Sequence, residues 1–481
     1  MALLNTLFPL AVVVFAITVN ANASCTGSSP TWTTTPDRAS VASCVASASR
    51  NDTINVTSGS ATWSSAITLS KGVTLAGGAG AGITVINSSG TMLSVQPDAT
   101  AIANEENIKI TGFTFDGNAN AQTLINIQGA SGITGTKPYR YIIIGDNKFQ
   151  NAAPSSQTLV GAAIQADADS DGQIRGVIYH NTFDRCNILL RIFSNNDTRE
   201  WANTAFNQLS YGSNDNLYFE DNTIMFSSSY NGDNPGWIES GQDGRIVVRF
   251  NTWNLSNATN PQEIWDIHGF QNWNGSPNSG QTGTMVVEYY DNTLSKMGTY
   301  RWVNHRGSWG MFFDNTLTGS GGNSIEINQY APGDNGGSGC AAQISPPPTN
   351  YTPQVNNTYV FNNTSNGTLN PMVPGDIIGN GCGVSENNGY WNQQVSFNGT
   401  VGIGRGPLSA RPATCTTRVG YWATDQGEWN SNHTGADGQF YKCTATNTWT
   451  LYYTPYPYPH PLRTGSQAGP NPPTNLAAVV Q

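Results

Sequence analysis

The chain has 481 residues, of which 11% are charged, and its formal net charge is −10 at pH 7. Nucleic acids and anionic membranes need a basic face on their partner, and 21 Lys and Arg residues against 31 Asp and Glu residues do not supply one. The low charge content and the 52 glycines disfavour long helices and favour short strands joined by turns, so we expect an all-β protein.

Residues 1–23 have the composition of a signal peptide. An apolar stretch runs from Leu3 to Val19, and Ala21-Asn22-Ala23 has the small-x-small form that signal peptidase recognises. A membrane helix needs about 20 apolar residues, and no other part of the chain is long and apolar enough. We therefore expect an exported, extracellular protein without a membrane span.

The chain has seven cysteines, which in an exported protein predict disulfides. Their proximity in the sequence suggests three pairs and leaves Cys186 as a buried free thiol. The three pairs are Cys25 with Cys44, Cys340 with Cys382, and Cys415 with Cys443. Asn-x-Ser/Thr triplets, for example at Asn196 and Asn254, are glycosylation sites only if the cell has the machinery.

An Asn-Thr step followed by an apolar residue recurs at the end of runs of β-forming residues. The spacing of these marker asparagines, 23 to 48 residues, is typical of a solenoid whose loops vary in length. The markers are Asn147, Asn181, Asn222, Asn251, Asn292, Asn315 and Asn363. Asn tolerates the left-handed backbone of a tight corner, and its amide can bond the next Asn in a ladder. A β-sandwich is the alternative, but its strands are usually spaced more evenly.

A second β-like run follows each marker, so each repeat predicts two or three short strands. Stacked coil on coil, such strands make a parallel β-helix. Alternate side chains of a strand face opposite sides, so we place Ile192, Ile238, Ile267, Val303 and Ile327 inward. The outward row is then Arg191, Trp237, Glu239, Asp266, His268, Trp302, Asn304, Arg306, Glu326 and Asn328.

The predicted domains are an entry segment at residues 24–60, the coils at 61–400, an aromatic-rich segment at 401–463 and a Pro/Gly-rich tail at 464–481. No amphipathic helix pattern of useful length appears. Residues 401–463 contain the last cysteine pair, and we expect them to form a small disulfide-tied C-terminal cap. A cap would cover strand edges that otherwise recruit other chains. The alternative for this segment is a module that binds glycans by stacking.

Four short segments carry a family resemblance: ATW at 61–63, LSKGVTLAG at 69–77, GYWATDQGEWN at 420–430 and PYPHPL at 457–462. They resemble bacterial proteins of an uncharacterised branch of the pectate-lyase-like superfamily. The resemblance implies a right-handed parallel β-helix over nearly the whole chain. It implies no single reaction, because the superfamily includes lyases, hydrolases, esterases, adhesins and binding proteins. The Gly-His-Gly of polygalacturonase-type hydrolases is absent, as is the Arg-x-Pro-x-x-Arg of calcium-dependent pectate lyases.

The outward row has the residue types that a polysaccharide groove needs. Glu239 and Asp266 would lie one coil apart, near the carboxylate separation of a retaining glycosidase, about 5 Å. Alternatively, His268 would be the base of a lyase, with Arg306 or Asn304 neutralising the substrate carboxylate. The expected catalytic residues are therefore Glu239, Asp266, His268 and Arg306. The expected substrate-binding residues are Arg191, Trp237, Trp302, Asn304, Glu326 and Asn328.

Two other interpretations remain open. The row could be only the solvated face of a sheet, with surface ion pairs of about 0.2–1 kcal/mol each. The protein would then be non-catalytic, an adhesive protein or a filament subunit. No metal site is expected from His and Cys spacing, and no cofactor is expected except possible calcium at the run DADSDG, residues 167–172, which lacks the Glu that closes an EF-hand loop.

Overall fold

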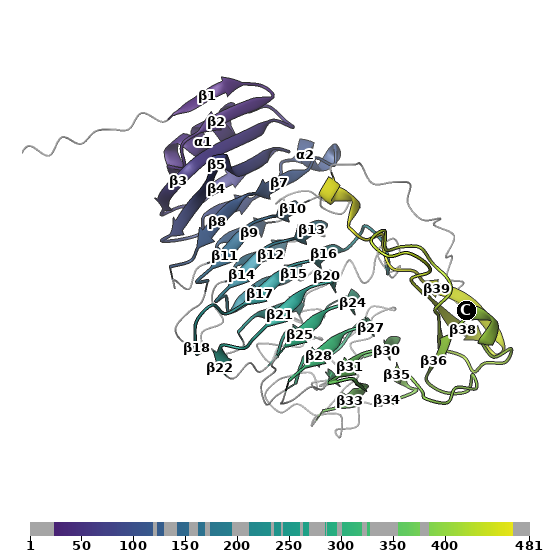
Figure 1. Ribbon diagram of the computed structural model, residues 1–481. Coiled ribbons are helices and arrows are strands. Elements are labelled where there is room, and N and C mark those ends of the chain that lie inside the picture. The colour runs from purple at the N-terminus through teal and green to yellow at the C-terminus, as the bar shows by residue number, and fades with distance from the viewer. Residues whose placement is uncertain are drawn as a thin grey trace, which may run out of the picture.

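The strands of the chain stack in parallel, coil upon coil, along one axis (Figure 1). Each coil contributes two consecutive strands to a 23-stranded sheet and one strand to a 10-stranded sheet. This arrangement is the parallel β-helix that the repeats predict. The computed structural model describes residues 24–118, 123–128, 142–152, 162–168, 174–194, 211–231, 235–241, 244–259, 263–268, 284, 286–295, 301–319, 325–327, 355–375 and 384–464.

The strands of the coils form three stacks, and two of these lie on either side of the corner that contains the marker asparagines. The strands that precede the corner are β7 (Ile108–Thr111), β10 (Ile142–Gly145), β13 (Gly176–Tyr179), β16 (Leu217–Glu220), β20 (Arg245–Arg249), β24 (Val286–Tyr290), β27 (Trp309–Phe313) and β30 (Thr358–Phe361). Those that follow it are β8 (Phe113–Asp116), β11 (Lys148–Gln150), β14 (Thr182–Asp184), β17 (Thr223–Met225), β21 (Thr252–Asn254), β25 (Thr293–Ser295), β28 (Thr316–Thr318) and β31 (Thr364–Ser365). The 10-stranded sheet contains β4 (Ile67–Leu69), β6 (Leu93–Val95), β9 (Ile125–Gln128), β12 (Ile164–Ala168), β15 (Ile188–Ser194), β19 (Trp237–Gly241), β23 (Trp265–Ile267), β26 (Val303–His305), β29 (Ile325–Ile327) and β33 (Met372–Pro374).

The core lies inside the coils, where equivalent side chains stack on one another. Phe149 stacks on Phe115 and on Phe183, with ring centroids 5.3 and 5.0 Å apart. Ile238 pairs with Trp265 in the 10-stranded sheet, and both are fully buried. Such aromatic stacks contribute about 0.5–1.5 kcal/mol each beyond their burial.

The marker asparagines form the predicted ladder along the corner. From Asn147 to Asn363, the backbone N–H of each marker donates to the side-chain oxygen of the next one, at 2.8–3.2 Å. The side-chain Nδ2 of each donates to the same oxygen. All seven side chains are buried, and Nδ2 also donates to a carbonyl of the preceding coil, as from Asn251 to Phe219.

The prediction that these asparagines are themselves left-handed is wrong. The residue before each marker has the positive φ instead, for example His180 at 50°, Asp221 at 55° and Phe250 at 56°. The chain turns one residue earlier than expected, so the marker Asn keeps an ordinary backbone and its amide extends along the axis. Asp and Asn hold most of these preceding positions because they tolerate the left-handed region best.

A short helix and a disulfide lie at the N-terminal end of the solenoid. Helix α1 (Arg38–Ser47) packs Val41, Cys44 and Val45 against the strands β1 (Cys25–Ser28), β2 (Thr31–Thr34), β3 (Thr53–Trp63) and β4. The Asp37 side chain accepts a hydrogen bond from the Ser40 N–H and caps the helix. The sequence shows no amphipathic pattern for this helix, because α1 has only ten residues and most are Ala or Ser, so its apolar face is short. Cys25 is bonded to Cys44, as predicted.

The remaining elements near this end and between the coils are short or irregular. Strand β2 already pairs in parallel with β3, which in turn pairs with β5 (Thr74–Ser88), and helix α2 (Ala99–Ala103) follows β6. The other strands are β18 (Tyr230–Asn231), β22 (Ala258–Thr259), β32 (Thr368–Leu369), β34 (Ser385–Glu386) and β35 (Gly389–Asn392). Within the described residues, no helix combines the length and the apolarity that a bilayer crossing requires.

Residues 401–464 continue from the last coil into a separate four-stranded sheet. Its strands are β36 (Ile403–Gly406), β37 (Gly420–Ala423), β38 (Gln439–Ala445) and β39 (Thr448–Tyr453), with the 3-10 helices η2 (Leu408–Ala410) and η3 (Pro461–Thr464). The predicted Cys415–Cys443 disulfide is present, and Cys186 is a buried free thiol. A bridge between Gln393 and Ile403 joins β36 to the last coil.

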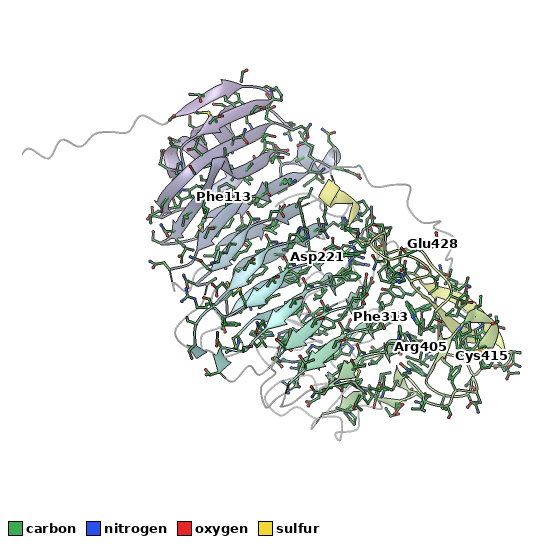
Figure 2. The ribbon with its side chains drawn as sticks, viewed as in Figure 1. Phe113, Asp221, Phe313, Arg405, Cys415 and Glu428 are labelled. Atoms are coloured by element: carbon green, nitrogen blue, oxygen red, sulfur yellow. A yellow bond between two sulfur atoms is a disulfide. The ribbon has the colours of Figure 1, made fainter. Side chains whose placement is uncertain are left out.

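The C-terminal segment also covers a side of the solenoid, which the interpretation as a cap did not include. Its aromatic residues form one buried cluster with the outer side chains of the larger sheet, and Phe313 stands between the two parts (Figure 2). The ring centroids of Phe313 and Trp422 are 5.1 Å apart, and Phe250 stacks on Tyr458 with ring centroids 3.7 Å apart. From Thr454 the chain runs back along the coils until η3 contacts β10 and β13 (Figure 1).

Candidate functional site

The outer face of the 10-stranded sheet carries the polar row that the sequence predicts. In the register of the parallel strands, Arg191 pairs with Glu239, Glu239 with Asp266, Asp266 with Asn304 and Asn304 with Glu326. The row occupies consecutive rungs, which are about 4.8 Å apart in a parallel sheet. The alternation of the strands therefore places these five side chains on one wall.

His268 and Arg306 extend the row from the residues that follow strands β23 and β26. The His268 Nε2 atom lies 3.2 Å from a carboxylate oxygen of Glu239 and 3.2 Å from one of Asp266. Arg306 forms an ion pair with the same oxygen of Asp266 that faces His268, Oδ2, and Asn304 donates to Asp266 Oδ1 at 3.0 Å. Asp266 is thus the centre of the cluster, held by three donors.

The charges of the cluster move the pKa values of its members apart. Burial alone would lower the pKa of His268, but the adjacent Asp266 charge and the contacts with both carboxylates raise it to about 9. Burial alone would raise the pKa of Asp266, but the charges of His268 and Arg306 hold it below its usual value. At neutral pH His268 is therefore a cation and Asp266 an anion.

Two members of the cluster were missed by the sequence analysis. Glu263 forms an ion pair with Arg301 at 2.9 Å, and Arg301 lies 3.9 Å from Glu326. Burial and the Asp266 charge raise the pKa of Glu263 to about 7. Both residues precede a strand, outside the alternating positions from which the row was predicted. Their position in the sequence could have identified them, because each is a charged residue directly before an apolar pair. These pairs are Ile264-Trp265 and Trp302-Val303.

The two tryptophans expected to line a groove are not exposed. Trp302 lies in the core, where its Nε1 donates to the Tyr289 hydroxyl at 3.1 Å. It precedes strand β26 and so does not follow the alternation of that strand. Trp237 is 3% exposed and packs against Ile188 of the neighbouring coil. Asn328 lies outside the described residues.

The centre of the row is buried, whereas its two ends are open. Glu239 and Asp266 are 1% and 2% exposed, and Asn304 is fully buried. The side chains of Arg191 and Glu326, at the two ends, are 27% and 25% exposed. The expected open wall of charged groups is thus a buried network with accessible termini, in which every charge of the centre has a partner of opposite sign.

The metal and disulfide expectations concern residues that lie partly outside the described ranges. Among the described residues, no group of three or more His, Cys, Asp and Glu side chains is arranged to hold a metal ion. Of the calcium-like run at 167–172, the structure describes only the backbone of the first two residues, at the end of strand β12. Cys340 and Cys382 lie outside the described residues, as do residues 1–23, where the signal peptide is expected, and nearly all of the tail.

Comparisons with known proteins do not identify a family for this chain. No family model matches it, and no curated protein matches it. A solved structure from Geobacillus virus E2, ORF18, is similar with a TM-score of 0.30 and 10% sequence identity. The match covers 86% of this chain and 72% of that chain. A similarity of this size supports no functional argument.

Proposed function

We propose that this protein is an exported, polysaccharide-active β-helix protein that uses the outer face of the 10-stranded sheet. The observation that carries the proposal is the cluster around Asp266, in which acids and bases from five consecutive rungs meet on one wall. Such a row extends along the solenoid axis, as a linear polymer would. The two disulfides at the described ends of the chain support export to an oxidising compartment.

The pKa values favour a glycoside hydrolase over a lyase. Glycoside hydrolysis needs one carboxylic acid that keeps its proton and one carboxylate that is ionised. Glu263, with a pKa of about 7, provides the acid, and Asp266, with its lowered pKa, provides the carboxylate. A lyase would need His268 as a neutral base, and the raised pKa of about 9 keeps this imidazole protonated at neutral pH. In the proposed hydrolase, Glu239 and His268 position Asp266.

The proposal is tested by assaying product release from a panel of neutral and uronic-acid polysaccharides. We expect Asp266→Asn and Glu263→Gln to lower the rate by about a hundredfold or more, the usual size of a lost acid or base. The matched control is Asp215→Asn, which breaks the Arg175–Asp215 ion pair at 2.6 Å outside the row and should leave the rate unchanged. Activity in the wild type that persists in both site variants would refute the assignment.

Non-catalytic function is the second candidate, favoured by the burial of the cluster. A network whose central carboxylates are 1% and 2% exposed and fully paired would also serve to hold neighbouring coils in register. On this candidate, no polysaccharide in the panel is cut by the wild type. The same variants would then lower the melting temperature and change no product yield, which separates the two candidates.

A further inference from the structure

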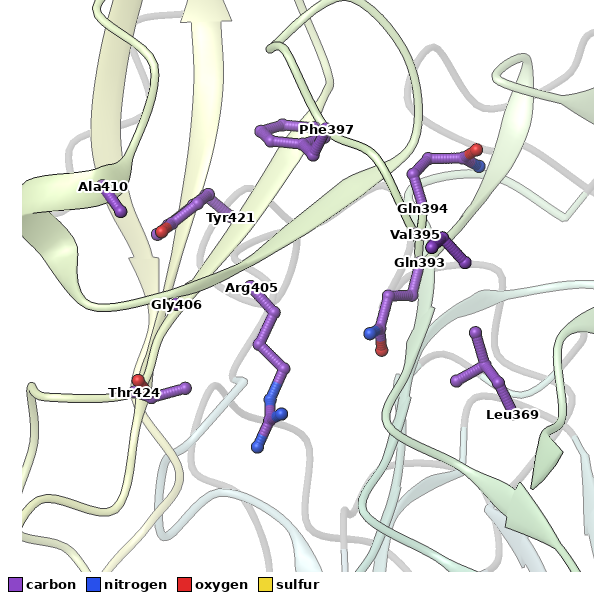
Figure 3. A pocket seen from close by; sticks show the side chains of 10 residues that line it. All are labelled: Leu369, Gln393, Gln394, Val395, Phe397, Arg405, Gly406, Ala410, Tyr421 and Thr424. Atoms are coloured by element: carbon purple, nitrogen blue, oxygen red, sulfur yellow. The ribbon is translucent and has the colours of Figure 1, made fainter. Parts of the chain in front are cut away.

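A pocket lies where the last coil meets the C-terminal sheet, away from the row around Asp266. Its volume is about 630 Å³, within the range of about 300–1,000 Å³ that is typical of ligand sites. One wall comes from the chain that follows β35, and the other from β36, η2 and β37 (Figure 3). The lining includes the side chains of Leu369, Gln393, Val395, Phe397, Arg405 and Thr424.

Arg405 is the charged residue of this lining, and its guanidinium extends into the space between the two walls (Figure 3). The side chain belongs to an exposed residue and forms no hydrogen bond or ion pair with other described residues. The charge of Arg405 acts on Asp314, which lies on a coil corner outside the lining. A guanidinium that extends into a pocket presents its fork of donors to a planar anion.

The Gln393 amide lies across the pocket from Arg405. Its Oε1 atom accepts a hydrogen bond from the Asn362 N–H at 2.7 Å, which fixes the orientation of the amide. The amide end points toward the Arg405 guanidinium, and the Thr424 hydroxyl lies on the opposite wall (Figure 3). The polar groups that converge here are therefore mainly donors, and the lining contains no Asp or Glu.

The rim of the pocket is apolar on the side away from Arg405. Val395 is 94% exposed, and Phe397 is half-buried beside Tyr421, with ring centroids 5.9 Å apart. Leu369 lies below Val395 in the same view (Figure 3). An exposed Val and a partly exposed aromatic ring provide the surface on which the C–H face of a sugar ring packs.

We propose that this pocket binds a carboxylated sugar residue, a hexuronate of an acidic polysaccharide. Arg405 receives the carboxylate as a bidentate ion pair, and Gln393 and Thr424 bond ring hydroxyls. Phe397 and Val395 contact the sugar ring. The inference does not depend on hydrolysis at Asp266, because a non-catalytic protein could hold the same sugar.

The test is calorimetric titration of the full-length exported protein with a uronic-acid trisaccharide, a neutral trisaccharide and acetate. We expect the uronic-acid trisaccharide to bind about tenfold or more tightly than either probe, since it offers both the charge and the ring. Arg405→Gln should lower its affinity by about tenfold, the usual effect of losing one charge-assisted contact. Phe397→Ala should weaken both trisaccharides and leave acetate unaffected.

Two controls keep the result specific. Lys109→Gln removes one positive charge from a half-exposed position on β7, far along the chain, and should leave all affinities unchanged. Asp215→Asn, outside both the pocket and the row around Asp266, should also leave them unchanged. A failure of the hydrolase proposal is seen separately, in the product-release assay of the Asp266→Asn and Glu263→Gln variants. Equal affinity for the acidic and neutral trisaccharides, no binding of either, or an Arg405→Gln variant that binds normally would each overturn the proposal.

Discussion

At the scale of single residues, a corner Asn has more bonded partners than an ordinary buried amide. The Asn292 side chain donates to Val248, Tyr290 and Asn315, and its oxygen accepts from the N–H and the Nδ2 of Asn251. Its loss leaves buried donors and acceptors unpaired on both neighbouring coils. Each such group costs about 1–3 kcal/mol.

We therefore expect Asn292→Ala to lower the free energy of unfolding by about 3 kcal/mol or more. Urea denaturation followed by circular dichroism measures this change. Asn432→Ala, at an exposed position in the C-terminal segment, is the control and should change stability by less than about 0.5 kcal/mol. Equal effects of the two substitutions would contradict a stabilising role of the ladder.

His268 makes stability depend on pH in a direction that can be stated. Its pKa rises from about 6.5 in an unfolded chain to about 9 in the folded protein. The folded state thus binds the proton more tightly, so this stabilisation is complete below pH 6.5 and is lost as the pH rises to 9. The melting temperature of the wild type should fall between pH 7 and pH 9, and His268→Gln should show a smaller fall. An identical slope in both proteins would refute this linkage.

Side chains alternate between the two faces of a strand, and this alternation explains which site residues were predictable. Arg191, Glu239, Asp266, Asn304 and Glu326 occupy alternating positions of regular strands, so their common wall followed from the sequence. Trp302 and Glu263 stand just before a strand, where the chain has not yet adopted the alternation. The burial of the cluster was not predictable either, because a row of polar residues gives no sign of what covers it.

At the scale of elements, the C-terminal segment is fixed to the solenoid by buried charges. Arg249, fully buried on β20, pairs with Glu220 at 2.6 Å and donates to the carbonyl groups of Tyr456 and Pro457. Glu220 also accepts from the His460 N–H and pairs with Arg463 at 3.0 Å. The sequence showed the aromatic residues of this segment but not the face that they cover, because pairs separated by more than 200 residues leave no local pattern.

Substitution of Arg249 tests this attachment. Arg249→Met should cost about 3–5 kcal/mol, since it leaves Glu220 with fewer partners in a buried site. Adding Glu220→Gln should restore part of the lost stability. Thermal melting and limited proteolysis near Tyr456 would detect both the loss and the restoration. Lys148→Met is the matched control, since its ion pair with Asp184 is half-exposed and contributes at most about 1 kcal/mol. Attachment by these charges is excluded if the double variant is no more stable than Arg249→Met.

At the scale of the whole molecule, a solenoid must protect the strand edges at its two ends. Strand β1 runs antiparallel to β2 and α1 packs across the first strands, so the stacking of parallel strands stops there. At the other end, a single β-bridge joins the last coil to β36, which is the first strand of the separate sheet. Uncovered edges of this kind pair with other chains.

We expect the intact chain to be monomeric and a variant that lacks residues 24–52 to associate through the exposed edge of β3. Light scattering coupled to size-exclusion chromatography measures both masses. The matched control is the double variant Cys25→Ser and Cys44→Ser, which removes the disulfide and retains α1. Ordered association of the intact chain would instead support the filament interpretation.

The corner ladder affects how the sequence of such a chain can change during evolution. Its asparagines stay in register although 23 to 48 residues separate successive members, so each intervening connection varies in length while the hydrogen-bonded corner remains in place. An insertion between two markers therefore leaves the adjacent coils aligned. The solenoid can acquire a new surface loop at one rung while every other rung keeps its position.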